Sequence, residues 1–162
     1  MATVPRASRP HMPNYGLLGP DEGRGLLPWS WAEERLRASR NYWVSTVSAS
    51  GAPHAMPVWC VWEDDALWFS TDGASRKAQN LARDARCVVT TEGAAEAVIV
   101  EGEAALASAP PVLARVALAY EAKYGMGYPP DSHVYAVRPR VAFGFVESAA
   151  QFAGAATRWR FA

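Results

Sequence analysis

Hydrophobic and polar positions alternate with a period of two along much of the chain from residue 42 onward, which is typical of half-buried β-strands. β-Branched and aromatic residues dominate segments 42–48, 54–62 and 66–71, and short polar turns separate them. We predict a β-hairpin from the first two segments. The third segment is expected to pair antiparallel with the second.

The same alternation predicts four more strands. Segments 87–91 and 97–104 flank a short turn and are expected to form a second hairpin, while 134–137 and 141–146 form a last pair. This gives six or seven antiparallel strands without strict alternation of strands and helices. Such an order disfavours a parallel sheet and favours a mainly β fold, a small closed β-barrel with attached helices.

Helical periodicity covers three segments, 31–38, 74–83 and 110–124. Ser30 is expected to cap the first helix, with Glu33 completing a capping box. The second helix is expected to end at Asp84. Pro110 at the start of the third helix and Gly125 after its end occupy the favoured positions for those residues.

Segment 1–28 differs from the rest because it has five prolines and four glycines and no periodic apolar pattern. We interpret it as an arm or a disordered tail, followed by a single domain over 29–162. The whole chain of 162 residues has the size of one ordinary domain and can bury a sizeable core.

Composition narrows the possible partners. Sixteen basic and 16 acidic residues give a formal net charge of zero, which argues against a nucleic-acid or anionic-membrane partner. No apolar stretch approaches the length of a membrane span, and no signal peptide is recognisable. Cys60 and Cys87 lie in apolar runs without a C-x-x-C pair, so we expect a reduced, cytoplasmic protein.

The most informative chemical pattern lies where the strand 66–71 leads into the helix 74–83. Ser70 and Thr71 end the strand, and Ser75, Arg76 and Lys77 follow at the start of the helix. Hydroxyls, free backbone N–H groups and two cations are what a phosphate group requires. The alternative is that Ser75 only caps the helix and the two cations are solvated.

A second pattern is the strand that contains Pro53 and Pro57. Proline donates no ladder hydrogen bond, so both must lie at an edge, a bulge or an unpaired face. Trp59 and Trp62 follow directly. Unpaired backbone beside flat apolar rings would suit a planar ring system, although core packing of the tryptophans is equally natural.

Other chemistries find less support in the sequence. His54 could be an acid, a base or a phosphate contact, but a lone strand histidine is more often structural, and the same holds for His11 and His133. No Cys/His cluster predicts a metal site, and no G-x-S-x-G motif predicts a serine hydrolase. No catalytic residue is assigned.

The end of the chain, 157–161, places Arg158 and Arg160 on either side of Trp159. Docking of Trp159 onto its own barrel would explain the tryptophan. Placement beside an anionic planar ligand, across a dimer interface, would explain the arginines as well.

In this order and spacing, the segments 42–47, 50–59, 69–81 and 157–161 resemble the flavin-binding split-barrel superfamily over about residues 30–161. That superfamily includes pyridoxamine 5'-phosphate oxidases and the actinobacterial flavin/deazaflavin oxidoreductases. The resemblance implies that residues 29–162 form a six-stranded antiparallel Greek-key split barrel of the FMN-binding type. It also implies a homodimer with two cofactors at the interface.

By the same resemblance, the cofactor ring lies along the strand and its phosphate lies at the helix start. The implied ring contacts are Met56, Pro57, Val58 and Trp59, and the implied phosphate contacts are Ser70, Thr71, Ser75, Arg76 and Lys77. Arg158 and Trp159 would reach a cofactor in or across the interface. The spacing from Ser70 to Asn80 resembles the deazaflavin branch slightly more, and the cofactor stays open between FMN and deazaflavin coenzyme F-420.

One departure from the family pattern matters. True pyridoxamine phosphate oxidases have a C-terminal Arg-x-His-x-Arg substrate motif, and no histidine follows His133 here. We therefore expect an oxidoreductase that transfers hydride to or from another small organic substrate. The alternatives are a non-catalytic carrier of a flavin, haem or other tetrapyrrole, and a structural barrel with an empty pocket.

Overall fold

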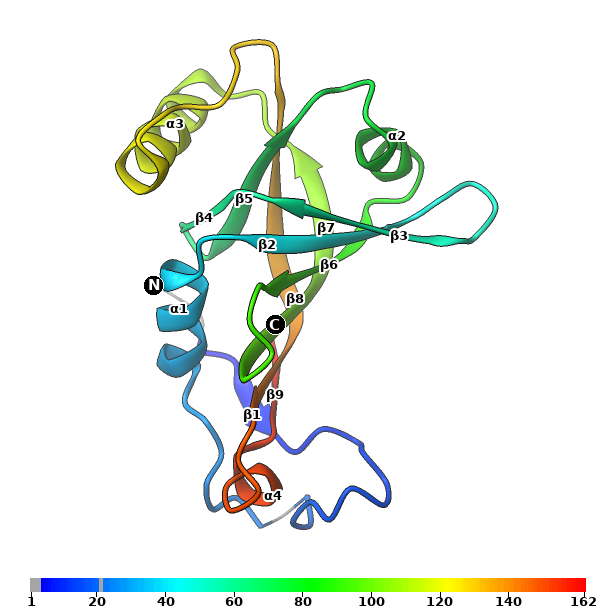
Figure 1. Cartoon of the computed structure of the whole chain (residues 1–162), viewed down its shortest axis with the longest axis vertical. Helices are drawn as coiled ribbons and strands as arrows, with labels where there is room; N and C mark the ends of the chain where they lie inside the picture. Colours follow the sequence, from blue (N-terminus) through cyan, green and yellow to red (C-terminus); the bar gives the residue numbers. More distant parts are fainter. Residues whose placement is uncertain (1–3, 21) are drawn as a thin grey trace.

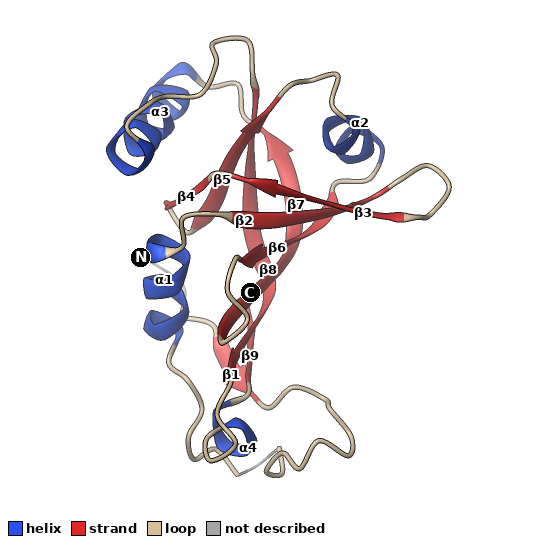
Figure 2. Cartoon of the chain, in the orientation of Figure 1, coloured by secondary structure: helices blue, strands red, loops and turns tan. Residues whose placement is uncertain are grey.

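The computed structural model describes residues 4–20 and 22–162, which form a mainly β, antiparallel fold with a few helices (Figures 1 and 2). The strands are β1 (Arg6–Ser8), β2 (Tyr42–Val47), β3 (Pro53–Val58), β4 (Cys60–Glu63), β5 (Ala66–Thr71), β6 (Arg86–Thr91), β7 (Glu96–Leu106), β8 (His133–Val146) and β9 (Thr157–Arg160). The helices are α1 (Trp29–Ala38), α2 (Arg76–Arg83), α3 (Pro110–Tyr124) and α4 (Phe152–Ala155).

The strands close a barrel of the split type, as the sequence predicts. Hydrogen-bonded pairs run from β3 through β2, β6, β7, β8 and β5 to β4, and every pair is antiparallel. β4 does not pair back to β3. The two ends of this series of strands, β3 and β4, are joined only covalently, because they are consecutive in the sequence.

The break between β3 and β4 is the split, and it corrects the prediction of one continuous strand over 54–62. Trp59 stands between the two strands. β3 pairs only with β2 among the described strands, so it is an edge strand, and β4 pairs with β5 as expected. Pro53 and Pro57 therefore lie on an edge, which confirms that prediction and explains why their missing N–H groups are tolerated.

The prediction of two strands over 134–137 and 141–146 is wrong, because β8 runs through both as one strand. Pro139 lies within it and pairs opposite Gly102 of β7. The register shifts between Glu101 and Gly102 at this point. Such a bulge disrupts the ladder locally, so a residue without an N–H can sit inside a long strand.

The three predicted helices form, but two of them begin elsewhere than predicted, since α2 begins at Arg76 and not at residue 74. α3 begins at Pro110 and ends before Gly125, which adopts a left-handed φ of 76°. α1 begins at Trp29, its N-cap is Pro28, and no side chain caps it, so the predicted Ser30 cap is wrong. The Trp29 ring packs edge-on against Trp62, Trp159 and Phe161, and this packing accounts for a helix start two residues earlier than predicted.

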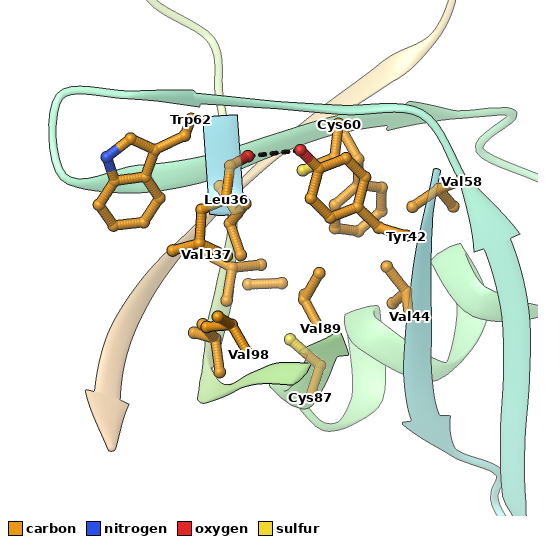
Figure 3. Packing of buried hydrophobic residues seen from close by; sticks show 14 of the residues in the cluster. Leu36, Tyr42, Val44, Val58, Cys60, Trp62, Cys87, Val89, Val98 and Val137 are labelled. Atoms are coloured by element: carbon orange, nitrogen blue, oxygen red, sulfur yellow. Dashed lines mark hydrogen bonds between the residues drawn. The ribbon is translucent and has the colours of Figure 1, made fainter. Parts of the chain in front are cut away.

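The barrel interior is filled by side chains from strands on all sides and from α1 (Figure 3). The Tyr42 hydroxyl donates a hydrogen bond to the Leu36 carbonyl oxygen, which ties β2 to α1. Cys60 and Cys87 are both buried free thiols. Burial raises the pKa of both, to about 12 for Cys87, so they behave as small hydrophobic groups.

The described part of segment 1–28 is an arm that lies against the barrel. β1 pairs with β9, which in turn pairs with β8, and Figure 1 shows β1 and β9 in the lower half of the molecule. The sequence patterns did not predict β1, α4 or β9. Within the described residues, no helix has the length and apolar character needed to cross a membrane.

Candidate functional site

The predicted phosphate-binding segment forms a compact turn between β5 and α2. The Thr71 and Ser75 hydroxyl oxygens are 3.0 Å apart, and the Ser75 hydroxyl also accepts a hydrogen bond from the Ala78 N–H at 3.3 Å. Ser75 is thus the N-cap of α2. Ser70, Thr71 and Lys77 are half-buried, so the turn presents hydroxyls beside a cation at the helix start.

Two backbone donors at this helix start are free. Among the described residues, the N–H groups of Arg76 and Lys77 have no hydrogen-bond acceptor, as is usual for the first turn of a helix. Neither side chain has a carboxylate within ion-pair distance in that part of the chain. The nearby Asp72 carboxylate accepts the Ala74 N–H at 2.7 Å. The geometry therefore suits an oxyanion at Arg76 and Lys77.

The pKa of Lys77 also reflects its partial burial. Desolvation by burial lowers its pKa below the ordinary lysine value. An anion placed next to its ammonium group would offset that cost, because opposite charges favour the ionised forms of both groups.

His133 joins this turn from the neighbouring strand, a contact that sequence reasoning did not place. It pairs with Thr71 across β5 and β8. A Cβ on Gly73 would come within 2.7 Å of the imidazole ring, so only glycine at this position allows the ring to lie so close to the turn. The cross-strand position of β8 was the missing information, since nothing local in the sequence brings residue 133 beside residue 71.

The edge strand β3 presents an open surface next to its partner β2. Met56 is 42% exposed, and Trp43, which pairs opposite Pro57, is 46% exposed. His54 lies on the same strand, and its buried Nδ1 atom has no hydrogen-bond partner among the described residues. An orphaned ring nitrogen differs from the hydrogen-bonded structural histidine that is common on strands.

Helix α2 is fixed to the β2–β3 hairpin by two polar contacts. The Asn80 side-chain amide donates to the Thr46 hydroxyl oxygen at 2.9 Å, and both side chains are buried. Arg83 donates to the Val47 carbonyl oxygen. These contacts hold the helix beside the edge strand, so the two predicted parts of the site belong to one region of the barrel (Figure 1).

Trp59 forms the other border of this region. Its ring is 38% exposed, and one face stacks on Tyr124 of α3 with ring centroids 4.4 Å apart and an interplanar angle of 2°. The Arg40 guanidinium lies 6.0 Å from the centroid of the Trp59 ring. A flat ring held in place by a second ring is a rigid platform.

Three polar side chains of α3 hold the split open on this border, and sequence reasoning missed them. The Tyr120 hydroxyl donates to the Trp59 carbonyl oxygen at 2.6 Å and accepts the Ser70 N–H at 3.1 Å. The Tyr124 hydroxyl accepts the Cys60 N–H at 2.8 Å. Backbone groups that β3 would have paired in an unbroken barrel are thus satisfied by tyrosines.

Lys123 completes this group. Its ammonium donates to the Tyr42 hydroxyl oxygen at 2.7 Å and to the Cys60 carbonyl oxygen at 2.9 Å. Desolvation lowers the pKa of Lys123 to about 8. The sequence does contain an indication of these contacts, because Tyr120, Lys123 and Tyr124 place polar groups on the buried face of α3.

Several predicted contacts lie elsewhere in this single chain. Val58 points into the core, and Asn80 is occupied by Thr46. Trp159 is fully buried in its own barrel, where its indole N–H donates to the Leu27 carbonyl oxygen at 3.2 Å. Arg158 lies on β9, at the opposite end of the molecule from α2 (Figure 1). The ring of Trp159 therefore cannot face a ligand in this structure.

The sequence pattern of the family described as pyridoxamine 5'-phosphate oxidase matches residues 30–157. No curated protein matches the sequence. Among solved structures, the fold is similar to the conserved hypothetical protein Rv2991 from Mycobacterium tuberculosis, with 23% identity, a TM-score of 0.65, and coverage of 72% of this chain and 82% of that one.

Two further solved structures show the same fold at lower identity. An F420 reductase is 18% identical with a TM-score of 0.56, covering 68% of this chain and 94% of that chain. The haem storage protein HutZ from Vibrio cholerae is 15% identical with a TM-score of 0.54, covering 67% of this chain and 87% of that chain. These likenesses establish the fold and leave the ligand to be argued from the residues.

Proposed function

This chain belongs to the pyridoxamine 5'-phosphate oxidase family, and from that premise we propose that it is an oxidoreductase that binds a flavin-type cofactor, FMN or deazaflavin coenzyme F-420. The observation that carries the proposal is the turn before α2. It combines free N–H groups of Arg76 and Lys77, two unpaired cations and the hydroxyls of Thr71 and Ser75. Both cofactors contain a phosphate that such a turn would bind.

The residues around this turn fit the rest of such a cofactor. The exposed backbone and side chains of β3, at Met56 and Pro57, offer a flat edge beside which a ring system can lie. His54 adds a polar atom that lacks a partner. The bound cofactor would supply the hydride chemistry, and the chain would hold and orient it and exclude water.

We also propose that the cofactor lies between two copies of the chain, with a small-molecule substrate beside it. Trp43 and Met56 expose large apolar surfaces on adjacent strands, which a second copy would cover. Sedimentation equilibrium tests this point. A mass of twice the 17.6 kDa chain is the expected result, and a monomer at micromolar concentration would contradict it.

Separate titrations with FMN and with deazaflavin coenzyme F-420, followed by tryptophan fluorescence, test cofactor binding. We expect one of them to bind with a Kd of about 1 μM or below. Binding of neither would overturn the proposal. Steady-state turnover with an electron acceptor then separates the oxidoreductase from a carrier of flavin, haem or another tetrapyrrole, because a carrier binds without turnover.

A further inference from the structure

A second basic region lies far from α2, where the arm meets β9. A pocket of about 410 Å³ is lined there by three basic side chains, Arg9, His11 and Arg158. Its other walls are mostly apolar and are formed by Pro10, Met12, Pro13, Leu17, Leu18, Gly19 and Pro20. The cofactor site described above uses none of these residues.

Arg9 is the most unusual of the three because it is only 5% exposed. Its guanidinium donates to backbone carbonyl oxygens of residues 22, 24, 154 and 156. Its Nε atom is buried and has no hydrogen-bond partner. No described carboxylate lies within ion-pair distance, so carbonyl dipoles alone compensate a buried positive charge.

Arg158 adds a second positive charge that no described carboxylate pairs with. Its guanidinium Nε and terminal nitrogen donate to the Ser8 hydroxyl oxygen at 3.3 and 3.2 Å. Among the described acidic residues, Glu22 contacts the pocket lining, because its carboxylate accepts the N–H of Gly19 at 3.0 Å. The described lining therefore carries the positive charges of two arginines, against the one carboxylate of Glu22 at the rim.

We propose that this pocket binds a small organic anion, through an oxyanion group at Arg158, beside the buried charge of Arg9, and an apolar body against the proline and leucine side chains. The oxyanion would place a negative charge near Arg9, for which the described residues supply no carboxylate, and the remaining guanidinium N–H groups of Arg158 would donate to it. The mostly apolar walls would contact the organic body of the anion, so an organic anion is favoured over a bare oxyanion. No residue of the turn before α2 lines this pocket.

Isothermal titration calorimetry of the full chain with 1-naphthoate tests the proposal, with 1-naphthamide as the neutral analogue and inorganic phosphate as the bare oxyanion. We expect saturable binding of 1-naphthoate and about tenfold weaker binding of the amide, because a charged hydrogen bond is lost. Phosphate should bind more weakly than naphthoate, since it lacks the apolar body. Equal binding of naphthoate and naphthamide, or binding of neither, would overturn the proposal.

Variants assign any binding to this pocket. Arg158→Gln should weaken naphthoate at least about tenfold, whereas the matched change Arg160→Gln, on the same strand but outside the pocket lining, should alter it less than about twofold. His11→Gln, on the arm, keeps the test decisive if Arg158→Gln fails to fold, and should also weaken binding. The double variant Arg76→Gln/Lys77→Gln should leave naphthoate binding unchanged, so failure here and failure of the cofactor proposal are distinguishable.

Discussion

The two halves of segment 53–63 share one stretch of chain and have opposite surroundings. β4 is buried, pairs with β5 and has its first backbone groups satisfied by Tyr124 and Lys123. β3 is exposed along most of its length and has one paired edge. Trp59 marks the change, because its carbonyl is bound by Tyr120 while part of its ring stays open to solvent.

The two surroundings show how a barrel can expose one strand edge while the backbone groups next to the break keep hydrogen-bond partners. Opening a barrel leaves N–H and C=O groups without partners, which costs free energy when they are buried. Here α3 supplies hydroxyl and ammonium partners on the β4 side. The open edge of β3 is therefore free for a ligand or a second copy, and mutations on the two sides should have different effects.

The largest effect is expected on the closed side. Tyr120→Phe combined with Tyr124→Phe removes the partners of the Ser70 and Cys60 N–H groups and of the Trp59 carbonyl. We expect the free energy of unfolding in urea to fall by about 3 kcal/mol or more, because buried backbone groups lose their hydrogen bonds. Tyr15→Phe, at an exposed tyrosine, is the control and should change it by less than about 0.5 kcal/mol. A double variant as stable as the control would mean that α3 does not support the split.

A smaller effect is expected at Ser75, where helix capping and anion binding can be separated. Ser75→Ala should lower the free energy of unfolding by about 1 kcal/mol through loss of the cap. Ser75→Asp keeps a good capping residue, so its stability should stay near that of the wild type, yet its carboxylate should repel a phosphate and weaken cofactor binding at least about tenfold. Cofactor binding by Ser75→Asp equal to the wild type would leave Ser75 as a cap only.

The smallest effect is a pH dependence from Lys123. Its pKa is about 8 in the folded chain and near 10.5 when unfolded, so between these values the unfolded chain binds more protons. The contribution of Lys123 to the free energy of unfolding therefore rises with pH across this window and is lowest below pH 8. Between pH 7 and pH 9.5, the free energy of unfolding of the wild type should rise relative to that of Lys123→Met. We expect a rise of less than about 1 kcal/mol, because the ammonium is partly hydrated. A difference between the two proteins that is constant or falls would contradict the assignment.

Local patterns predict much of this fold. The hairpins β2–β3 and β6–β7, the helix α3 with its terminal Gly125, and the edge position of Pro53 and Pro57 all follow from residues close in sequence. What local patterns missed depends on distant contacts. The break at Trp59 needs the tyrosines of α3, and the passage of β8 through Pro139 needs the register shift opposite Glu101 and Gly102, where β8 has one extra residue, Arg140.

The candidate site divides in the same way. Ser70 to Lys77 are consecutive, so sequence alone could bring them together, and the structure places them in one turn. His133 reaches that turn only through strand pairing. From the sequence, Trp159 fitted either a ligand contact or a side chain docked onto its own barrel. In the structure it is buried in the barrel, where Trp29 packs against it. This contact joins residues far apart in sequence, so local patterns do not reveal it.

We propose that the turn before α2, beside the open edge of β3, binds the phosphate of a flavin-type cofactor. The most direct test is the Kd of the cofactor for Arg76→Gln/Lys77→Gln against Arg37→Gln/Arg115→Gln, which removes two exposed cations from α1 and α3. We predict binding at least about 100-fold weaker for the first pair, because two charged hydrogen bonds contribute about 3 kcal/mol or more, and less than about twofold weaker for the second. Equal dissociation constants for both double variants and the wild type would contradict the claim.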